Sequence, residues 1–491
     1  MKHDSYDVVV IGAGIVGSMV ARELSKYRLS VAVLDKESDV GMGQSTSNSA
    51  IIHSGHDPQP GTDKARFNVR GNQLWFEIAR DLEIPIERTG AMIVAVEDDD
   101  PAGLEELAER GRTNGVPVEI LSREAALEKE PMLTPETVGA LWTPTAGIVD
   151  PFQGVVGAAE NAAENGVEFI LNTEVTGAII EAGHLVALET SVGRIATRVC
   201  INAAGVHSDE IMHMFGVRPE FEITARRGEY FVFDQAAMRI GTVLFPMPSE
   251  KGKGILVTHT THGNTMVGPN SDYISDKEDH STTEKGMHEI LDGAQRLVPA
   301  VSARSVIATF AGLRATGNYK PVPDHGRDFL IERSAEVEGL INLAGVESPG
   351  YVAAPAIAER SVELLRETGL DLEKKKDWKP TRTAIPRFHH LSHEERDVLI
   401  REDPAYGRIV CRCEEVTEGE ILRAIRSPIP ATTYDAIKRR TWLGTGRCQG
   451  SFDYPRTMEI LARELGLSMT EITKKGPGSV FLYRRTKEEV L

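Results

Sequence analysis

The chain has 491 residues, 41% of them hydrophobic and 26% charged, which is the composition of a globular protein with room for two or three domains. Its formal net charge of −18 argues against general nucleic-acid binding. No run of about 18 apolar residues occurs, so the sequence predicts no membrane-spanning helix. Neither the charge nor the lack of a long apolar run excludes docking on a membrane surface.

The residues from Tyr6 to Asp35 predict a strand, a glycine turn, a helix and a second strand, around which the rest of the chain is organised. The two strands and the helix are expected over residues 7–11, 30–34 and 15–27. The turn carries the G-x-G-x-x-G spacing at Gly12, Gly14 and Gly17. Such glycines allow a tight turn, close approach to a pyrophosphate and close helix packing. With the helix N-terminus facing the diphosphate and Asp35 placed for a ribose hydroxyl, the pattern predicts a dinucleotide site.

A polar loop rich in Gly, Ser and Thr is predicted after Asp35, over residues 41–65. Its side chains can donate hydrogen bonds to phosphate or ribityl oxygens, although an ordinary surface loop is the alternative interpretation. The candidate donors are Ser45, Thr46, Ser47 and Asn48. His53 and His56 lie in the same segment.

Apolar spacing and turn residues predict helices and strands in alternation further along the chain. Helices are expected over residues 65–81, 101–114, 122–130, 150–165 and 281–298, and strands over residues 90–96 and 167–171. The strand-rich region over residues 219–312 indicates a second domain with a mixed sheet, inserted into the first. A strand, a glycine turn and a long helix then return at residues 339–367, in GLINLAGVESPGYVAAPAIAERSVELLRE.

Three glycine-bearing turns, far apart in the sequence, point to one long cofactor. They lie at residues 12–17, in CINAAG (residues 200–205) and in LAGVESPG (residues 343–350). A nicotinamide cofactor rarely needs so many segments, whereas FAD is longer and half buried. The sequence therefore favours FAD.

Six stretches within roughly the first 365 residues carry a family resemblance, namely VVVIGAGIVGSMVARELS, STSNSAIIHSGHDPQPG, INAAGVHSD, RRGEYF, FAGLRA and NLAGVESPGYVAAPAIA. In these stretches the chain resembles the FAD-dependent oxidoreductases of the D-amino-acid oxidase type. Within them it is most similar to the FAD-dependent glycerol-3-phosphate dehydrogenases and the L-2-hydroxyglutarate dehydrogenases. The resemblance implies an α/β fold, with a Rossmann-type FAD-binding domain and an inserted mixed α+β substrate domain.

The resemblance also implies the residues that contact FAD. Val175 is expected at the adenine end through its backbone, and Gly205 at the diphosphate. The turn before the helix that starts near Val352 is expected at the flavin, where the helix N-terminus can face the C2 carbonyl on which negative charge collects. The implied contacts are Gly12, Gly14, Gly17, Asp35, Lys36, Ser45, Thr46, Ser49, Val175, Gly205, Ser348, Pro349, Gly350 and Tyr351.

A flavin enzyme that oxidises a carbinol needs a base for the hydroxyl proton, and histidine suits this task near neutral pH. His53, in the loop expected beneath the flavin, is the first candidate, and His259 in the second domain is its rival. Arg314, in AGLRA, matches the arginine that fixes the anionic end of the substrate in this superfamily. Its guanidinium suits a carboxylate or a phosphate alike. Further pocket candidates are Tyr230, Arg227, Thr261 and Lys320.

The chain has four cysteines, three of which cluster near its C-terminal end. Cys200 lies in an apolar strand and is expected to be a buried small residue. Cys411, Cys413 and Cys448 favour a metal site in a reducing compartment over a disulfide framework. A capping box, Thr417 with Glu420, is expected to open a helix just after the C-x-C pair.

Residues 408–465 resemble the ferredoxin-like domain related to bacterioferritin-associated ferredoxin, which holds a [2Fe–2S] cluster through four cysteines. This chain has Asp453 where the fourth cysteine is expected. Five alternatives stay open at this point: an Asp453 oxygen ligand, an outside ligand, loss of the cluster, a bare three-cysteine domain, and an adventitious zinc site.

These expectations divide the chain into an FAD-dependent oxidoreductase, a polar linker and a small helical [2Fe–2S]-type domain, at residues 1–366, 367–404 and 405–491. The FAD-binding parts of the first unit are expected at residues 1–90, 145–215 and 325–366. Its substrate domain is expected at residues 91–144 and 216–324.

The leading hypothesis is a dehydrogenase that oxidises a small anionic 2-hydroxy compound, first sn-glycerol 3-phosphate to dihydroxyacetone phosphate by hydride transfer to flavin N5. L-2-hydroxyglutarate or a related hydroxy acid is the second substrate. An FAD subunit of an amine or amino-acid dehydrogenase complex, with catalysis in a partner subunit, competes, and an oxygen-using flavin oxidase comes third. Electrons would pass to the tail cluster or to an acceptor such as a quinone or a redox protein. The expected location is the cytoplasm, with peripheral membrane association left open.

Overall fold

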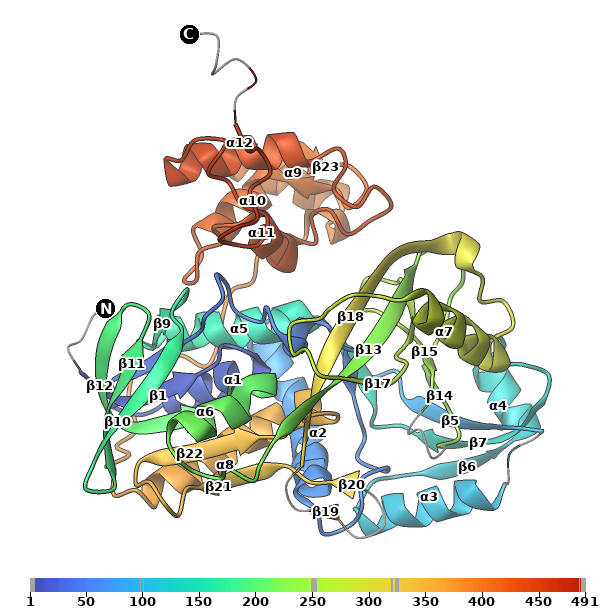
Figure 1. Cartoon of the computed structure of the whole chain (residues 1–491). Coiled ribbons are helices and arrows are strands. Elements are labelled where there is room, and N and C mark those ends of the chain that lie inside the picture. The colour runs from blue at the N-terminus through green and yellow to red at the C-terminus, as the bar shows by residue number, and fades with distance from the viewer. Residues whose placement is uncertain are drawn as a thin grey trace.

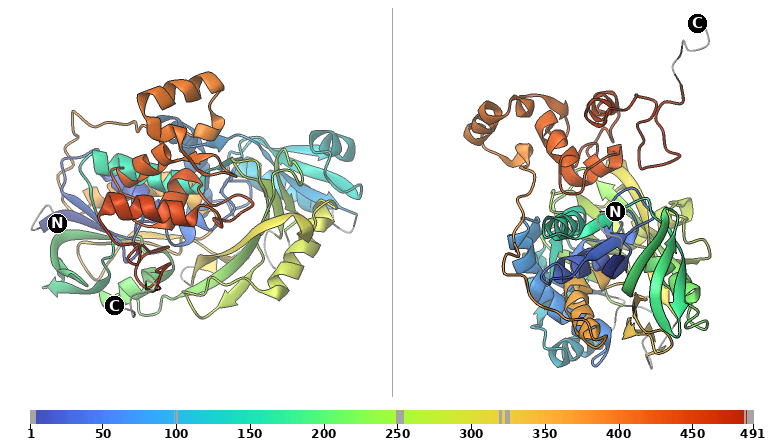
Figure 2. Two further views of the ribbon diagram at one scale, coloured as in Figure 1. Left: turned by 90° about the horizontal axis from the view of Figure 1, so that it is seen from above. Right: turned by 90° about the vertical axis from the view of Figure 1, so that its left-hand side faces the viewer.

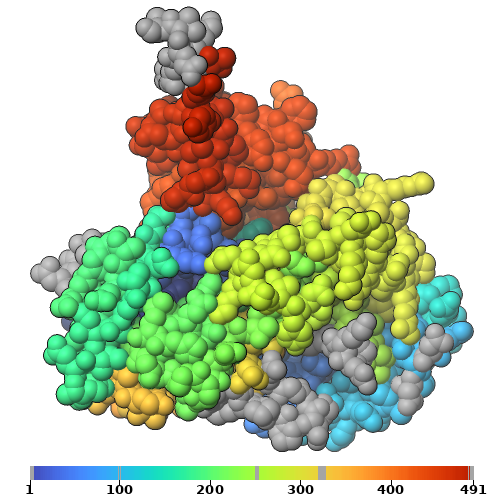
Figure 3. Space-filling model, in the orientation of Figure 1, coloured from blue at the N-terminus to red at the C-terminus, as the bar shows by residue number. Residues whose placement is uncertain are grey.

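The computed structural model describes residues 5–97, 99, 101–248, 254–318, 321–322, 326–484 and 486. Two units, each built on a large sheet, lie side by side, and a helical tail sits on the first of them (Figure 1). The view from above and the space-filling view show the same placement of the tail (Figures 2 and 3). Among the described residues, no helix combines the length and the apolar character needed to cross a bilayer.

The first sheet is built on parallel strands, in the spatial order β9 (Glu168–Ile170), β2 (Val31–Leu34), β1 (Ser5–Ile11), β12 (Gly193–Asn202) and β22 (Leu340–Ala344). Three antiparallel strands extend it, β10 (Val175–Glu181), β11 (His184–Thr190) and β21 (Leu330–Arg333). One face packs on α1 (Ile15–Leu24), α5 (Pro151–Glu164) and α8 (Gly350–Arg366), and the other packs on α6 (Ser208–Met214). Because both faces are covered, Val8, Val9 and Val10 are all fully buried.

The second sheet is mostly antiparallel and forms the neighbouring unit. Its path is β17 (Asp272–Ile274), β13 (Ile223–Phe233), β16 (Thr265–Gly268), β15 (Leu256–His259), β14 (Val243–Pro246), β5 (Ala91–Val96), β7 (Thr137–Thr143) and β6 (Glu119–Ser122). β18 (Val306–Gly317) pairs with β13 along nearly its whole length. That pairing places Arg226 opposite Arg314 and Tyr230 opposite Phe310.

Smaller elements complete the body. The remaining strands are β3 (Ile51–Ile52), β4 (Ile86–Glu87), β8 (Gly147–Val149), β19 (Pro321–Val322) and β20 (Gly326–Arg327). The remaining helices are α2 (Asp63–Asp81), α3 (Ala102–Thr113), α4 (Arg123–Lys129) and α7 (Glu284–Leu297). Two predicted helices are shorter than expected by three residues or more. α1 ends at Leu24 because the Tyr27 N–H bonds the Leu24 carbonyl three residues back, and α7 starts after Thr283, which caps it.

The tail has a core of its own. It contains β23 (Ile409–Cys411), β24 (Val416–Thr417), α10 (Glu418–Ile425), α11 (Tyr434–Thr441) and α12 (Tyr454–Leu465). Ile421, Ile437 and Ile460 are fully buried at its centre. The predicted capping box of Thr417 and Glu420 is confirmed at the start of α10.

The segment expected to be a linker packs on the body before it reaches the tail, as the side view shows (Figure 2). Arg382 in this segment is 5% exposed. Its guanidinium donates to Glu160 Oε2 at 2.9 Å and to Gln153 Oε1 at 3.0 Å, both on α5. The segment also contains α9 (His393–Glu402). Its polar composition predicted a linker. The structure shows that part of this segment is packed, because the buried Arg382 needs polar partners and α5 supplies them.

A buried ion pair joins the tail to the body. Asp39 follows β2 and is 1% exposed, and it receives hydrogen bonds from Arg439 and Arg440 of α11 at 2.8–3.0 Å. Burial alone would raise the pKa of Asp39, but the guanidinium groups of Arg440 and Arg439 outweigh it and lower the pKa to about 2. Removing either partner would leave a charge buried without compensation.

A second contact joins three segments at Asp150, the N-cap of α5. Asp150 Oδ1 accepts the Phe152 and Gln153 N–H groups at 3.0 Å. Asp150 Oδ2 accepts the Trp442 indole N–H of the tail at 2.9 Å and an Arg387 N–H of the connecting segment at 3.3 Å. The tail is therefore attached to the same helix that the connecting segment covers.

The substitution Asp39→Asn is expected to weaken tail docking by about 3–5 kcal/mol, because it removes the carboxylate that both buried guanidinium groups bind and leaves only Glu160, 4.0 Å from Arg440, as an anion. Since the pKa of Asp39 is lowered to about 2 in the folded protein, the wild-type pair contributes its full stability above about pH 4 and loses it as pH falls toward 2. Urea unfolding and protease cleavage within residues 367–404 measure both effects.

The matched control is Asp435→Asn, which removes a pair with the half-exposed Lys474 on the tail. That change is expected to cost only about 0–1 kcal/mol. Equal effects of the two substitutions would contradict the assignment of Asp39 as the docking residue.

Candidate active site

A cavity of about 960 Å³ lies between the two sheets and is lined by residues from both. Its volume falls in the range of pockets that enclose whole ligands. Most of the site residues predicted from the sequence line it, which are Gly12, Gly14, Asp35, Lys36, Ser45, Ser49, His53, Val175, Gly205, Tyr230, Arg314, Ser348, Pro349, Gly350 and Tyr351. The three glycine-bearing turns thus meet at one cavity, as the sequence predicts.

The three glycines of the first turn have different surroundings. Gly12 has φ +102°, and a Cβ there would lie 2.4 Å from the Ala203 carbonyl oxygen of the second turn. A Cβ on Gly17 would lie 1.9 Å from the Gly12 oxygen, so Gly17 serves helix packing and does not itself line the cavity. Gly14 faces the cavity, with Ser45 Oγ 2.9 Å from its ideal Cβ position.

Asp35 holds the first turn in place. Its carboxylate accepts the Ala13 N–H at 2.7 Å and the Glu37 N–H at 2.9 Å, and burial raises its pKa. The neighbouring Lys36 pairs with Glu278, at 2.6 Å, on a segment of the second unit. Because Glu278 also lines the cavity, the two units meet at this end of it.

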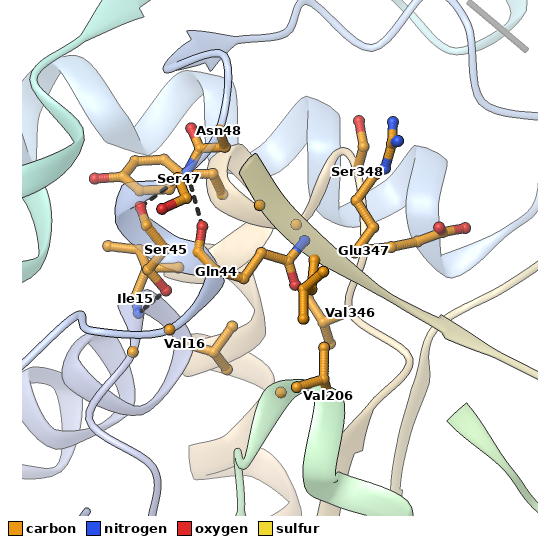
Figure 4. Close-up of a pocket in the computed structure, with 18 of the residues that line it drawn as sticks. Ile15, Val16, Gln44, Ser45, Ser47, Asn48, Val206, Val346, Glu347 and Ser348 are labelled. Carbon is orange, nitrogen blue, oxygen red and sulfur yellow. Dashed lines mark hydrogen bonds between the residues drawn. The ribbon is translucent and has the colours of Figure 1, made fainter. Parts of the chain in front are cut away.

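The N-terminus of α1 opens on the cavity without a side-chain cap from Gly14 and without an acidic residue in its first turn. Ser45 Oγ accepts the Ile15 N–H at 2.9 Å (Figure 4). Figure 4 shows the 44–48 loop on one side of the cavity and the 346–348 turn on the other. A hydroxyl at this position stands where a phosphate oxygen would accept the same N–H. Thr46 points elsewhere, because its hydroxyl donates to the Gly41 carbonyl at 2.7 Å.

The N-terminus of α8 also faces the cavity and has no side-chain cap and no acid in its first turn. A second helix dipole therefore presents its positive end there. Tyr351, in the first turn, donates its hydroxyl to the Pro151 carbonyl at 3.0 Å and stacks on Trp75 at 5.2 Å. These contacts fix the tyrosine between the cavity and the first turn of α5.

Arg314 reaches the cavity from β18. Its guanidinium donates to three backbone carbonyls, those of Arg226 at 3.2 Å, Arg227 at 3.0 Å and Asn270 at 2.7 Å. Burial and the nearby Arg226 lower its pKa to about 10, so it is charged at neutral pH. None of the three carbonyls neutralises that charge.

Two further cations beside Arg314 were not predicted from the sequence. Lys64 and Arg226 line the cavity and bind the two oxygens of Glu347, at 2.9 and 2.7 Å. Burial acts to raise the pKa of Glu347, but Lys64 and Arg226 lower it to about 2. Strand alternation could have identified Arg226, because residues 226 and 230 share one face of β13. The predicted Arg227 faces the other way and pairs with Asp279 at 2.6 Å.

The two candidate histidines are separated. His53 lines the cavity, its carbonyl accepts the Asn68 and Asn72 amides, and its ring lies 5.8 Å from that of Phe245. His259 does not line the cavity and lies 3.4 Å from Glu87. Position therefore favours His53 over His259.

Tyr230, another predicted pocket residue, lines the cavity. Its hydroxyl lies 3.3 Å from the hydroxyl of Ser49, and its ring stacks on that of Phe310 with the ring centres 4.7 Å apart. Thr261 is not among the residues that line the cavity. Lys320 lies outside the residues that the structure describes.

The tail brings its three cysteines together. Cys413 Sγ lies 3.7 Å from Cys411 Sγ and 3.3 Å from Cys448 Sγ. Asp453 is 1% exposed and lies beside Cys411, whereas Cys200 is buried in β12. In the described part of the chain, no three His, Cys, Asp or Glu side chains are arranged to hold a single metal ion.

Comparisons with known proteins agree with this division. The model of the FAD dependent oxidoreductase family matches residues 7–364, and that of the BFD-like [2Fe-2S] binding domain matches residues 409–463. The chain is 43% identical over 487 residues to a glycerol 3-phosphate dehydrogenase of Caloramator mitchellensis, covering 99% of this chain and 100% of that protein. It is 29% identical over 400 residues to the mitochondrial L-2-hydroxyglutarate dehydrogenase of Arabidopsis thaliana, covering 72% and 82%.

Among solved structures, the dithionite-reduced L-alpha-glycerophosphate oxidase of Mycoplasma pneumoniae with FAD bound superposes with a TM-score of 0.72 at 30% identity. That match covers 77% of this chain and 98% of the oxidase. Fold, cavity and glycine turns define a flavin-dependent oxidoreductase with a C-terminal cysteine domain. The chain belongs to the FAD-dependent oxidoreductase family and is a glycerol-3-phosphate dehydrogenase-like enzyme. The predicted fold class and FAD are confirmed.

The substitution Gly12→Ala is expected to lower the FAD content of the purified protein at least roughly tenfold, because the new Cβ would clash at an unfavourable φ. Flavin absorbance per chain measures the effect. The control Gly241→Ala places a Cβ 3.5 Å from Glu130 Oε2, an ordinary contact, and should retain FAD. Full FAD content in Gly12→Ala would contradict the assigned role of the turn.

Proposed function

We propose that the protein oxidises sn-glycerol 3-phosphate to dihydroxyacetone phosphate. The observation that carries this proposal is the cluster of cations, Lys64, Arg226 and Arg314, at the cavity beside the carboxylate of Glu347. The similarity to a glycerol 3-phosphate dehydrogenase over the whole chain supports the same substrate.

The charges of this cluster suit an anion. Glu347 is ionised at neutral pH because its pKa is about 2, and it balances one of the three cations. Arg314 stays charged, and its partners are neutral carbonyls. A phosphate monoester carries close to two negative charges near pH 7, and guanidinium groups bind its oxygens in parallel.

His53 is proposed as the base that accepts the hydroxyl proton of the substrate. It lies on the same cavity as Arg314, so an anion held by the arginine would leave its hydroxyl-bearing carbon within the enclosed space. A bound FAD would accept the hydride of that carbon at N5. The N-termini of α1 and α8 would hold the negative charges of the cofactor, the first at the diphosphate and the second at the flavin.

L-2-hydroxyglutarate is the second candidate substrate, because its carboxylates would also bind Arg314 and Arg226. The similarity to the L-2-hydroxyglutarate dehydrogenase of Arabidopsis thaliana supports this second substrate. The acceptor of the electrons is proposed to be a quinone or a redox protein. Oxygen is the competing acceptor, because some of the similar proteins are named oxidases.

Anaerobic assays with a dye acceptor should give a kcat/KM for sn-glycerol 3-phosphate at least roughly 100-fold above that for L-2-hydroxyglutarate. A preference for the dicarboxylate would overturn the proposed substrate. Absence of turnover with either compound would favour a subunit whose catalytic partner is another chain. Peroxide formed in stoichiometric yield in air would identify an oxidase.

The substitution His53→Asn should lower kcat by roughly 10²–10⁴-fold with little change in KM, because it removes a base but not the anion site. The matched control His259→Asn removes only the contact with Glu87, and kcat should stay within about twofold. Steady-state kinetics with the dye measure both variants. A larger loss in His259→Asn than in His53→Asn would reverse the assignment.

A further inference from the structure

The tail holds three sulfur ligands but lacks a fourth cysteine. Iron–sulfur clusters of the [2Fe–2S] type are normally held by four protein ligands. In the tail, Cys411, Cys413 and Cys448 supply three thiols whose neighbouring sulfur atoms are 3.3–3.7 Å apart. The thiols range from buried at Cys411 to exposed at Cys413, so the group of three reaches from the tail core to its surface.

Backbone N–H groups surround these thiols. Those of Glu414 and Gly444 donate to the sulfur of Cys411, and that of Cys448 donates to the sulfur of Cys413. Such bonds stabilise thiolates and are a recurrent feature around metal-bound sulfur. A Cβ on Gly446 would lie 2.3 Å from Glu414 Oε1 and 2.8 Å from Cys413 Sγ, so the loop before Cys448 packs tightly against both side chains.

Asp453 does not have the usual role of an aspartate at its position. It is the N-cap of α12, where an aspartate commonly accepts N–H groups of the first turn, yet its side chain makes no capping hydrogen bond. Its Oδ1 accepts the Tyr434 hydroxyl at 2.6 Å. Its Oδ2 is buried and accepts no hydrogen bond from an N–H or O–H group of the described residues.

The Asp453 carboxyl group lies beside one of the three thiols. The Cys411 thiol is within reach of a weak hydrogen bond to this carboxyl group. Within the described part of the chain, no lysine, arginine or histidine forms an ion pair with Asp453, although the residue is 1% exposed. The partly buried Lys438 acts on it only at longer range, and burial raises the pKa of Asp453. A buried carboxyl group without an ion-pair partner is either neutral or bound to a metal.

We propose that Asp453 Oδ2 is the fourth ligand of a [2Fe–2S] cluster whose other ligands are Cys411, Cys413 and Cys448. Tyr434 then orients the carboxylate by holding Oδ1, in the manner of the groups that orient metal ligands from behind. Gly444 and Gly450, at φ +75° and +84°, let the surrounding loop pass close to the Tyr434 hydroxyl, where a Cβ would lie at 2.3 and 2.6 Å. The bound cluster would be a one-electron carrier.

The test uses the full-length protein, reconstituted under anaerobic conditions with ferrous iron and sulfide. Iron and sulfide per chain, and the electron paramagnetic resonance spectrum after reduction, are the readouts. Wild type should hold about two iron and two sulfide ions per chain. Asp453→Asn, which keeps the shape and an acceptor for Tyr434 but loses the anionic oxygen, should retain below roughly a fifth of that iron.

Two further variants keep the result interpretable. Asp453→Cys should hold wild-type iron with an altered spectrum, because a thiolate replaces the oxygen ligand. Tyr434→Phe removes only the orienting hydroxyl and should keep more than roughly half of the iron. FAD content, unchanged in all variants, reports that the body is folded.

Three outcomes would overturn the proposal. In the first, Asp453→Asn keeps the iron content and the spectrum of wild type, which would mean that the fourth ligand comes from elsewhere. In the second, Asp453→Cys binds iron and wild type does not, so aspartate has abolished the site. In the third, neither protein binds iron. Because no readout involves the substrate, these results are independent of the proposed glycerol 3-phosphate activity.

Discussion

One buried carboxylate, that of Asp150, holds the parts of the molecule in their positions. It is fully buried, caps α5 with one oxygen, and with the other binds Trp442 of the tail, Arg387 of the connecting segment and His262 of the second unit. Burial alone would raise its pKa, but His262 and Arg387 outweigh it and lower the pKa. Because an unpaired buried charge is costly, the carboxylate requires all of these segments to meet at one point.

This meeting point is close to the cavity of the candidate active site, because the residue that follows Asp150 contacts a cavity-lining side chain. Pro151, next to Asp150, accepts the hydroxyl of Tyr351, which lines the cavity and lies in the first turn of α8. The first turn of α5 therefore contacts both the cavity-lining tyrosine and the tail. A shift of α5 would therefore displace both the cavity-lining tyrosine and the tail, since close-packed interiors transmit strain. The tail is thus packed as a structural part of the oxidoreductase, and its attachment does not rest on a flexible tether.

The sequence predicted well what depends on local pattern and poorly what depends on side chains meeting across domains. The opening turn from Gly12 to Gly17 could be predicted because glycine spacing and strand alternation are local properties of the sequence. Arg226 could also have been found, because alternation along β13 places it on the face of Tyr230. Asp39 and Asp150, in contrast, look like ordinary loop and cap residues, and their partners lie about 300–400 residues away. Such pairings need the tertiary structure, in which burial makes each charge require a partner.

The cationic end of the cavity shows how such pairing prepares a binding site. Three like charges in one enclosed space would repel each other, and Glu347 relieves this by bridging Lys64 and Arg226. The bridge fixes both side chains before any ligand arrives, which lowers the entropic cost of binding. Arg314 is fixed instead by neutral carbonyls, so its positive charge is the one left without a counterion. An anionic substrate of the proposed kind would therefore be attracted most strongly to Arg314, and that contact would set its orientation in the cavity.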